Sequence, residues 1–321
     1  MNSKDTLTLD PNIENQLLEQ FDIQPEKVKP YLEHPERLST FMDFRVDFAF
    51  KYILGHKRIL IKLINDILPV QVADIEYLSN EIPVMSIKEK RATFDVICTA
   101  RGSGEKFIAE MQCLPDADMD DRLLFYGSSL LHNQIERGDE SYLLRPVYVL
   151  CIANYSRRHS ADVAHGQFFF SYQYREASNP KDCLTDKLQF FFLELPRLQK
   201  IWESLETNLE RWCYLFRNLN SFVETPPDQA GFEDLFSVAQ TGELNEKRIS
   251  KYVTSMVTEY DRKVIGDYFY REGMEEGMAK GIAKGLAEAE RIAAKKFRDL
   301  GVDLTIISQA TGLTESEIEA L

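Results

Sequence analysis

Apolar residues recur at helical spacing over residues 39–67, STFMDFRVDFAFKYILGHKRILIKLINDI. Side chains three and four positions apart share one face of a helix, so this pattern predicts amphipathic helical structure. Ser39 or Thr40 suits a cap at its start, and Gly55 followed by a histidine predicts a break into two helices. The preceding residues 1–38 are acidic and contain four prolines. They predict an N-terminal arm with one short helix.

Strand-like runs follow this helical segment. ADIEYL (73–78) is the first, and RATFDVICTA (91–100) and EKFIAEMQCL (105–114) are the next two. They contain many β-branched and aromatic residues, which favour strands. The segment RGSG (101–104) between the second and third runs carries two glycines. Two glycines between β-prone runs predict a hairpin.

A helix and a buried strand complete the predicted core. The run DADMDDRLLFYGSSLLHNQIERG (116–138) carries acidic residues in its first turn, which suit a helix N-terminus. RPVYVLCIANY (145–155) is apolar almost throughout, as expected of a strand covered on both faces. A hairpin followed by a helical crossover and a buried strand predicts a mixed central sheet flanked by helices, an α/β fold. Further strand-like runs lie at 167–175 and 188–194, and helical runs lie at 197–221 and 245–262.

The C-terminal residues have a pattern of their own, with glycine at every fourth position: Gly273, Gly277, Gly281 and Gly285. Each glycine inside a helix costs about 1 kcal/mol relative to alanine. Close approach of a second helix would offset that cost, so we expect self-association, with a flexible tether as the alternative. The segment 303–321 is similar to a helix-turn-helix, with Asp303 as a cap, Gly312 at the turn and a Thr314–Glu317 capping box. Its acidic second helix favours a packing or dimer module over a DNA reader.

These patterns divide the chain into four predicted parts. They are an N-terminal arm (1–38), an α/β domain (39–225), a helical linker region (226–270) and a Gly-spaced helical tail (271–321) that forms a homodimer.

Composition narrows the class of protein. The net charge of −14 argues against a protein that coats nucleic acid non-specifically, because such a protein needs a broad basic face. The five cysteines include no C-x-x-C pair, which predicts buried free thiols without a zinc site or disulfide framework. The chain shows neither an apolar run of membrane-span length nor a secretory signal, so we expect a cytoplasmic protein without a membrane partner.

Three polar residues in the predicted hairpin carry the candidate chemistry. Asp95 is flanked by apolar neighbours, where an unpaired carboxylate is costly. Glu110 and Gln112 are two positions apart and therefore share one face of their strand. Two carboxylates with an amide or main-chain oxygen are ligands that Mg²⁺ prefers. By spacing alone, ordinary solvated hairpin residues remain an alternative.

The chain resembles the PD-(D/E)XK nuclease group described as recombination-promoting nuclease or putative transposase. The resemblance rests on DFAFKYILG (47–55), ATFDVICTA (92–100), FIAEMQ (107–112), the segment 121–155 and the Gly-spaced tail. It implies a restriction-endonuclease-like PD-(D/E)XK core with a helical C-terminal extension.

The resemblance also implies roles for individual residues. Asp95 and Glu110 would bind Mg²⁺ or Mn²⁺, with Asp47 as an additional acid. Gln112 stands where the wider fold class usually has lysine, and it can orient water by hydrogen bonds but brings no charge. For the remaining residues, ordinary surface or core roles stay open beside contact with phosphate or support of the site: Arg122, Tyr126 and Lys51.

The resemblance implies a Mg²⁺-dependent DNA endonuclease that serves recombination, mobile elements or phage defence. The alternative is a catalytically weak dimeric protein that binds DNA or a partner without cutting. Cleavage of RNA by the same site is a third possibility.

Overall fold

The computed structural model describes residues 7–79, 81–82, 92–135, 141–159, 163–229 and 231–321. Within the predicted segments, residues 1–6, Arg91 and 136–138 lie outside the described residues. The chain divides into two compact units, Met1–Tyr260 and Asp261–Leu321. The division falls inside the long helix α8 (Glu246–Asp299), which continues from the end of the first unit through the glycine repeat.

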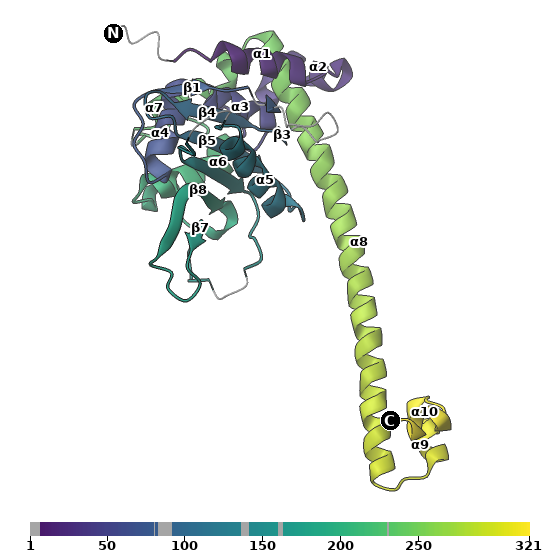
Figure 1. The fold of residues 1–321 in the computed structure, drawn as a ribbon. Coiled ribbons are helices and arrows are strands. Elements are labelled where there is room, and N and C mark those ends of the chain that lie inside the picture. The colour runs from purple at the N-terminus through teal and green to yellow at the C-terminus, as the bar shows by residue number, and fades with distance from the viewer. Residues whose placement is uncertain (1–6, 80, 83–91, 136–140, 160–162, 230) are drawn as a thin grey trace. The chain divides into compact units, whose positions relative to one another are not determined.

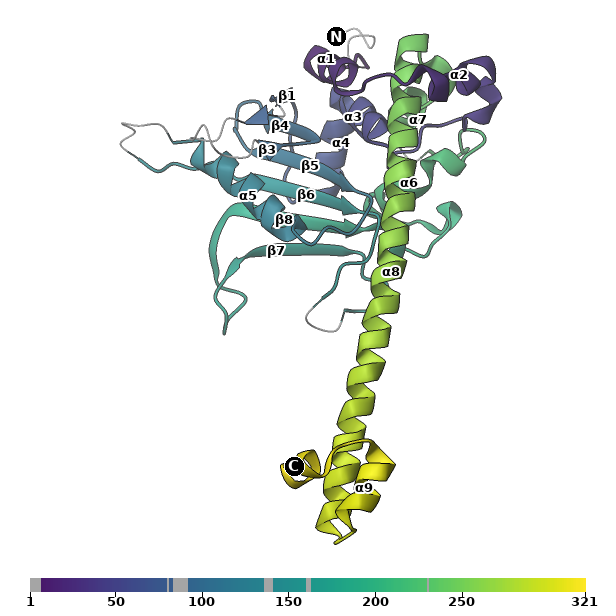
Figure 2. The ribbon, with the colours of Figure 1, turned by 90° about the vertical axis from the view of Figure 1, so that its right-hand side faces the viewer.

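A mixed six-stranded sheet forms the centre of the first unit, with the strand order β1-β4-β5-β6-β8-β7 (Figures 1 and 2). β5, β6 and β8 run parallel to one another, and the other three strands pair antiparallel with their neighbours. The strands are β1 (Ile75–Tyr77), β4 (Val96–Ala100), β5 (Lys106–Gln112), β6 (Val147–Ala153), β7 (Phe169–Arg175) and β8 (Cys183–Glu194). A separate pair joins β2 (Glu81–Ile82) to β3 (Ala92–Thr93). This mixed sheet flanked by helices confirms the predicted α/β class.

The predicted hairpin connects β4 and β5. Gly102 and Gly104 have φ values of 93° and 83°, a backbone conformation that residues with a Cβ rarely adopt. The turn therefore depends on the two glycines that revealed it in the sequence.

The prediction of one continuous strand over 91–100 is wrong at its centre. β3 ends at Thr93, β4 begins at Val96, and Asp95 lies between them. Phe94 and Ile97 are buried in the same apolar cluster. In a regular strand, positions three apart point to opposite faces, so burying both on one side requires this interruption.

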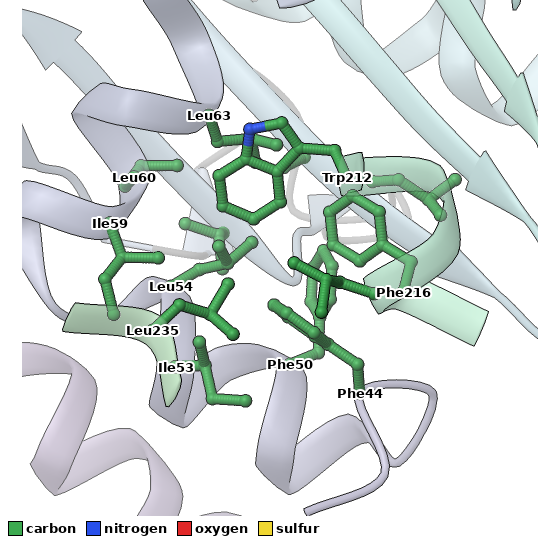
Figure 3. Close-up of a cluster of buried hydrophobic side chains, with 14 of the residues drawn as sticks. Phe44, Phe50, Ile53, Leu54, Ile59, Leu60, Leu63, Trp212, Phe216 and Leu235 are labelled. Carbon is green, nitrogen blue, oxygen red and sulfur yellow. The ribbon is translucent and has the colours of Figure 1, made fainter. Parts of the chain in front are cut away.

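One face of the sheet carries a large apolar core. It packs β4, β5 and β6 against α3 (Asp47–Leu54), α4 (Lys57–Ile67), α6 (Asn208–Asn218) and α7 (Glu233–Val238). Figure 3 shows Trp212 and Phe216 of α6 beside Phe44 and Phe50. Trp212 also donates its indole N–H to Oδ2 of Asp66 at 2.8 Å. The bond satisfies a polar group that burial would otherwise leave unpaired.

The other face is covered by α5 (Met119–His132), which lies across the strands in Figure 2. Leu123, Tyr126 and Leu130 of α5 join Ile108 of β5 in a second apolar cluster. Gly127 lets the helix approach closely, because a Cβ there would lie 2.6 Å from Cδ1 of Leu188. The predicted helix after Pro115 is thus confirmed, with a later start and an earlier end.

The N-terminal residues contain more structure than the predicted arm with one short helix. They form α1 (Pro11–Gln20), α2 (Pro25–Glu33) and a 3-10 turn (Pro35–Arg37). Leu9 and Ile13 pack against Gly55 so closely that a Cβ at position 55 would lie 2.6 and 2.8 Å from their side chains. The N-terminal helix α1 is therefore packed against the core of this unit.

The predicted break at Gly55 separates α3 from α4, as expected. The predicted helix start at Ser39 or Thr40 is wrong, because α3 begins at Asp47. Residues before it pair with a distant segment instead: Phe41 forms a β-bridge with Gln240, and Met42 N–H donates to the Ala239 carbonyl at 2.8 Å. Further 3-10 turns lie at Leu195–Arg197, Trp202–Ser204, Leu219–Ser221 and Thr241–Glu243.

The second unit contains the end of α8 with α9 (Leu304–Thr311) and α10 (Glu315–Glu319). Asp303 caps α9, Gly312 ends it with a φ of 75°, and Thr314 and Glu317 form a capping box at α10, all as the sequence predicts. A small core of Ala294, Ile307 and Ile318 holds these helices together. Over the described residues, no helix combines the length and apolar character needed to cross a membrane.

Candidate active site

Two hydrogen bonds tie Asp95 to Glu110 and to the next residue of β5, Met111. The main-chain N–H of Asp95 donates to Oε1 of Glu110 at 3.1 Å, and the main-chain N–H of Met111 donates to Oδ2 of Asp95 at 2.9 Å. The strand register supports this arrangement, because Val96 lies opposite Ala109 on the neighbouring strand. The break before β4 and the antiparallel pairing thus bring the two carboxyl groups together.

Burial and nearby negative charges raise the pKa of both carboxyl groups. For Asp95, burial is the larger cause and the charge of Asp47 the next, and together they raise its pKa to about 6. For Glu110, burial comes first and the charge of Asp95 second, and its pKa lies well above the usual range. Lys51 and Arg122 act in the opposite direction on both groups. A further cation beside the pair would favour ionisation of both acids.

Gln112 is the last residue of β5 and is half-buried. It shares a strand face with Glu110, because Ala109 and Met111 point into the core on the other side. Its main-chain carbonyl accepts a hydrogen bond from the N–H of Asn154 at 2.8 Å. Gln112 thus lies at the carboxyl ends of the parallel strands, two residues after Glu110 and on the same face of β5.

The helix α3 brings Asp47 and Lys51 to the same place. Nζ of Lys51 lies 2.9 Å from Oδ1 of Asp47 and 3.7 Å from Oδ1 of Asp95. Gln20 of α1 contacts both α3 residues: its Nε2 donates to Oδ2 of Asp47 at 2.7 Å, and its Oε1 accepts from Nζ of Lys51 at 2.9 Å. Sequence reasoning missed Gln20, because no local pattern relates it to residues on α3.

Arg122 and Tyr126 reach the pair from α5, one helical turn apart. The Arg122 guanidinium donates to Oδ2 of Asp116 at 2.9 Å, while its buried Nε has no hydrogen-bond partner among the described residues. The Tyr126 ring lies 4.7 Å from the Phe94 ring between centroids. Burial and then the charge of Glu110 raise the pKa of its hydroxyl. Both side chains therefore border the carboxyl pair, and Arg122 retains an unused donor.

The donor set fits a divalent cation in part. The structure supplies two adjacent carboxyl groups, buried Glu110 and half-buried Asp95, whose raised pKa values would fall on binding a cation. In the described part of the chain, no three His, Cys, Asp or Glu side chains form a ready metal cluster. The remaining ligands would have to come from Gln112, main-chain carbonyls, water or a substrate phosphate.

A separate cavity lies away from these residues. It has a volume of about 490 Å³ and is lined by residues after β6 and β8, including Arg197, Lys200 and His165. The arginine and lysine side chains that line it already form ion pairs: Arg197 with Glu194 at 2.7 Å and Lys200 with Glu210 at 2.6 Å. None of the candidate site residues lines this cavity, so it is separate from the Asp95–Glu110 site.

A family model described as PD-(D/E)XK nuclease family transposase matches residues 44–268, more than half of the chain. The chain belongs to this family. Its members' nuclease fold agrees with the mixed sheet described above, and the match includes every site residue named from the sequence. Family membership indicates a nuclease- or transposase-type function with DNA as substrate. Searches of curated proteins and of solved structures gave no match.

Proposed function

We propose that this PD-(D/E)XK family protein is a Mg²⁺-dependent DNA endonuclease. The observation that supports the proposal most directly is the hydrogen bonding that ties the Asp95 and Glu110 carboxyl groups to adjacent main-chain N–H groups, with Glu110 buried and Asp95 half-buried beside it. Buried carboxyl groups destabilise a fold unless they are paired or bind a cation. A metal-binding function gives a reason for keeping both acids in this position.

Each group has a part in the proposed hydrolysis. When bound, Mg²⁺ or Mn²⁺ would supply Lewis-acid chemistry and lower the pKa of the attacking water. Asp95 and Glu110 would hold the cation, with Asp47 as an additional acid near them. Gln112 would orient the attacking water through hydrogen bonds. The Arg122 guanidinium, whose side chain is 35% exposed, would donate to a substrate phosphate oxygen, and Tyr126 would support the positions of Arg122 and Glu110.

The test measures nicking of supercoiled plasmid with Mg²⁺ by the wild-type protein beside Asp95→Ala and Glu110→Ala. We expect both variants to lose at least about 100-fold in rate, because removing a group that stabilises a hydrolytic transition state commonly costs that much. Asp74→Ala serves as the matched control. Asp74 also forms an ion pair beside the sheet, with Lys57 at 2.9 Å, but it lies at the other end of β4 from Asp95, because Ile75 pairs with Ala100. Equal nicking by all four proteins would refute the assignment.

One observation favours a second candidate, a catalytically weak protein that binds DNA or a partner without cutting. Gln112 carries no charge at the position where the wider fold class has lysine. DNA binding without Mg²⁺-dependent cleavage in the same assay would support this candidate. A labelled RNA substrate in a parallel reaction separates DNA from RNA cleavage. We expect the activity to be cytoplasmic and to serve recombination, mobile elements or phage defence.

We also infer that the tail joins two copies of the chain. Large apolar side chains on α8 are exposed at every fourth position: Met274 at 58%, Met278 at 68%, Ile282 at 65% and Leu286 at 61%. A Cβ added to Gly277, Gly281 or Gly285 would meet no described atom within 4 Å. Exposed apolar residues beside open glycines fit a second helix at close range.

A further inference from the structure

The candidate site contains a buried, positively charged side chain, that of Lys51, which is not part of the PD-(D/E)XK motif. The side chain of Lys51 is only 4% exposed, although lysine is rarely buried in proteins. Its partner in the helical ion pair, Asp47, has 26% of its side chain exposed. An ion pair between residues four apart on a helix forms readily at the surface. Pairing with Asp47 alone therefore does not explain why Lys51 points inward.

The direction of Lys51 is fixed by contacts from two other elements. Its Nζ lies 3.7 Å from Oδ1 of Asp95, which directly precedes β4. From α1, Oε1 of Gln20 accepts a hydrogen bond from Nζ at 2.9 Å, and the same amide donates to Asp47. An ammonium group has three donors. Two of them point to Asp47 and Gln20, and the third direction faces the carboxyl pair, where a substrate phosphate would lie.

The charges around Nζ support a role at the site. Nζ lies within ion-pair distance of two carboxylates, those of Asp47 and Asp95. Neighbouring negative charges favour the ammonium form of a lysine. The positive charge of Lys51 also acts on Glu110, on the neighbouring strand. Gln112, by contrast, stands on the same strand face as Glu110 and carries no charge.

We propose that Lys51 supplies from α3 the positive charge that Gln112 does not supply from β5, and that Gln20 of α1 is the positioning residue that holds it. This assignment rests on the proposed nuclease function. Lys51 would be a catalytic residue that contacts the non-bridging oxygens of the scissile phosphate. Gln112 would keep the separate task of orienting the water.

The step this serves is hydrolysis of one phosphodiester bond. The water oxygen forms a bond to phosphorus, and the bond from phosphorus to the leaving sugar oxygen breaks. The water loses one proton to solvent, and the leaving oxygen gains one from solvent. Negative charge grows on the phosphate oxygens between these events. A fixed ammonium group beside them stabilises that charge without giving up its own proton.

The experiment removes the positive charge of Lys51 from α3 and introduces one at Gln112 on β5. Lys51→Met removes it, and the double variant Lys51→Met with Gln112→Lys restores a lysine at the motif position. Single-turnover cleavage of plasmid is measured at saturating Mg²⁺, together with melting temperature, Mg²⁺ affinity by calorimetry and DNA affinity without metal. Lys57→Met is the matched control, because Lys57 opens the next helix and pairs with Asp74 at 2.9 Å.

We expect Lys51→Met to lower the cleavage rate about 100-fold while Mg²⁺ affinity holds or increases, since a nearby positive charge has been removed. The double variant should recover at least about 10-fold, and Lys57→Met should stay within about 2-fold of wild type. If Lys51→Met does not fold, Lys51→Gln takes its place, because glutamine keeps hydrogen-bonding capacity without the charge.

Two results would overturn the assignment of Lys51. One is a wild-type cleavage rate in a folded, uncharged variant at saturating Mg²⁺, which would make Lys51 a structural ion-pair partner. The other is a double variant that folds normally but recovers nothing. Failure of the proposed function looks different, because the wild-type protein would then show no cleavage that depends on Asp95.

The role of Gln20 is tested separately. Gln20→Ala should lower the cleavage rate about 3- to 10-fold with unchanged DNA affinity, whereas Glu19→Ala, an exposed neighbour on α1, should have no effect. Gln20→Glu should also lower the rate, because its carboxylate still accepts from Lys51 but cannot donate to Asp47 and repels that carboxylate. Equal rates for Gln20→Ala and Glu19→Ala would remove Gln20 from the proposal.

Discussion

At the scale of single residues, the central feature is the way Asp95 and Glu110 are held. The Glu110 carboxyl group accepts the main-chain N–H of Asp95, and the Asp95 carboxyl group accepts that of Met111, so neither can turn away without losing its bond. The surroundings disfavour two negative charges, because burial raises both pKa values, with the charge of Asp47 adding to it for Asp95 and the charge of Asp95 adding to it for Glu110. The metal-free protein therefore stores an electrostatic cost that a divalent cation would relieve.

This cost predicts a pH-dependent effect of Asp95→Asn. The folded-state pKa of Asp95 is about 6, above its ordinary value of 3.8, so the wild-type protein loses stability as pH rises through this range. An asparagine does not titrate and still accepts the Met111 N–H. In EDTA, the variant should be more stable than wild type by about 1–3 kcal/mol at pH 7.5, and the gain should vanish near pH 3.5.

Urea unfolding followed from pH 3.5 to 8 measures this difference. Adding Mg²⁺ should stabilise wild type more at pH 7.5 than at pH 5 and should leave Asp95→Asn nearly unchanged. A stability difference that does not vary with pH would show that the Asp95 carboxyl group titrates alike in the folded and unfolded protein.

At the scale of elements, the site is assembled from three helices that meet the sheet from different directions. α3 supplies Asp47 and Lys51, α1 supplies Gln20, and α5 supplies Arg122 and Tyr126. α5 reaches its position through Gly127, where a Cβ would lie 2.6 Å from Leu188 and 3.2 Å from Val149. The distance between α5 and the sheet thus depends on a missing side chain.

We therefore predict that Gly127→Ala destabilises the protein even though alanine favours helices. The gain in helix propensity is about 1 kcal/mol, but overpacking against two buried side chains costs about 1–3 kcal/mol. A net loss of about 1 kcal/mol is expected in urea unfolding. The neighbouring, exposed Ser128→Ala should instead gain a few tenths of a kcal/mol. A more stable Gly127→Ala protein would show that Leu188 repacks freely.

At the scale of the whole molecule, the two units differ in how much apolar surface they bury. The first buries a large core on both faces of a sheet. The second has only a small core around Ala294, Ile307 and Ile318, while the α8 stripe from Met274 to Leu286 is exposed. A helix with an apolar stripe and no described cover gains stability by pairing with another helix.

The pairing predicts that Ile282→Glu converts a dimer into a monomer in analytical ultracentrifugation. The free energy cost of burying an unpaired carboxylate in a helix interface exceeds the free energy gained by burying one isoleucine side chain there. Lys284→Glu is the matched control, because it changes charge on the same helix without interrupting the apolar stripe, and it should stay dimeric. Gly281→Leu should also dissociate the dimer by preventing close approach. A wild-type protein that sediments as a monomer at all concentrations would contradict the inference.

The sequence by itself determined the elements whose signals are local. Hydrophobic periodicity located the strands and the helices around them, Gly102 and Gly104 located the hairpin, and Thr314 with Glu317 located the last capping box. These features depend on backbone conformations and side-chain spacing within a few residues, which the order of residues records directly. The sequence also singled out Asp95 and Glu110 as a candidate pair.

Only the tertiary structure decided how that pair is surrounded. The break in the strand before Val96 follows from burying Phe94 and Ile97 on one side, and the start of α3 at Asp47 follows from pairing of Phe41 with Gln240. The inward direction of Lys51 depends on Gln20, 31 residues earlier in the chain. Such contacts arise when separate elements pack together, and no local period in the sequence encodes which side chains will then meet.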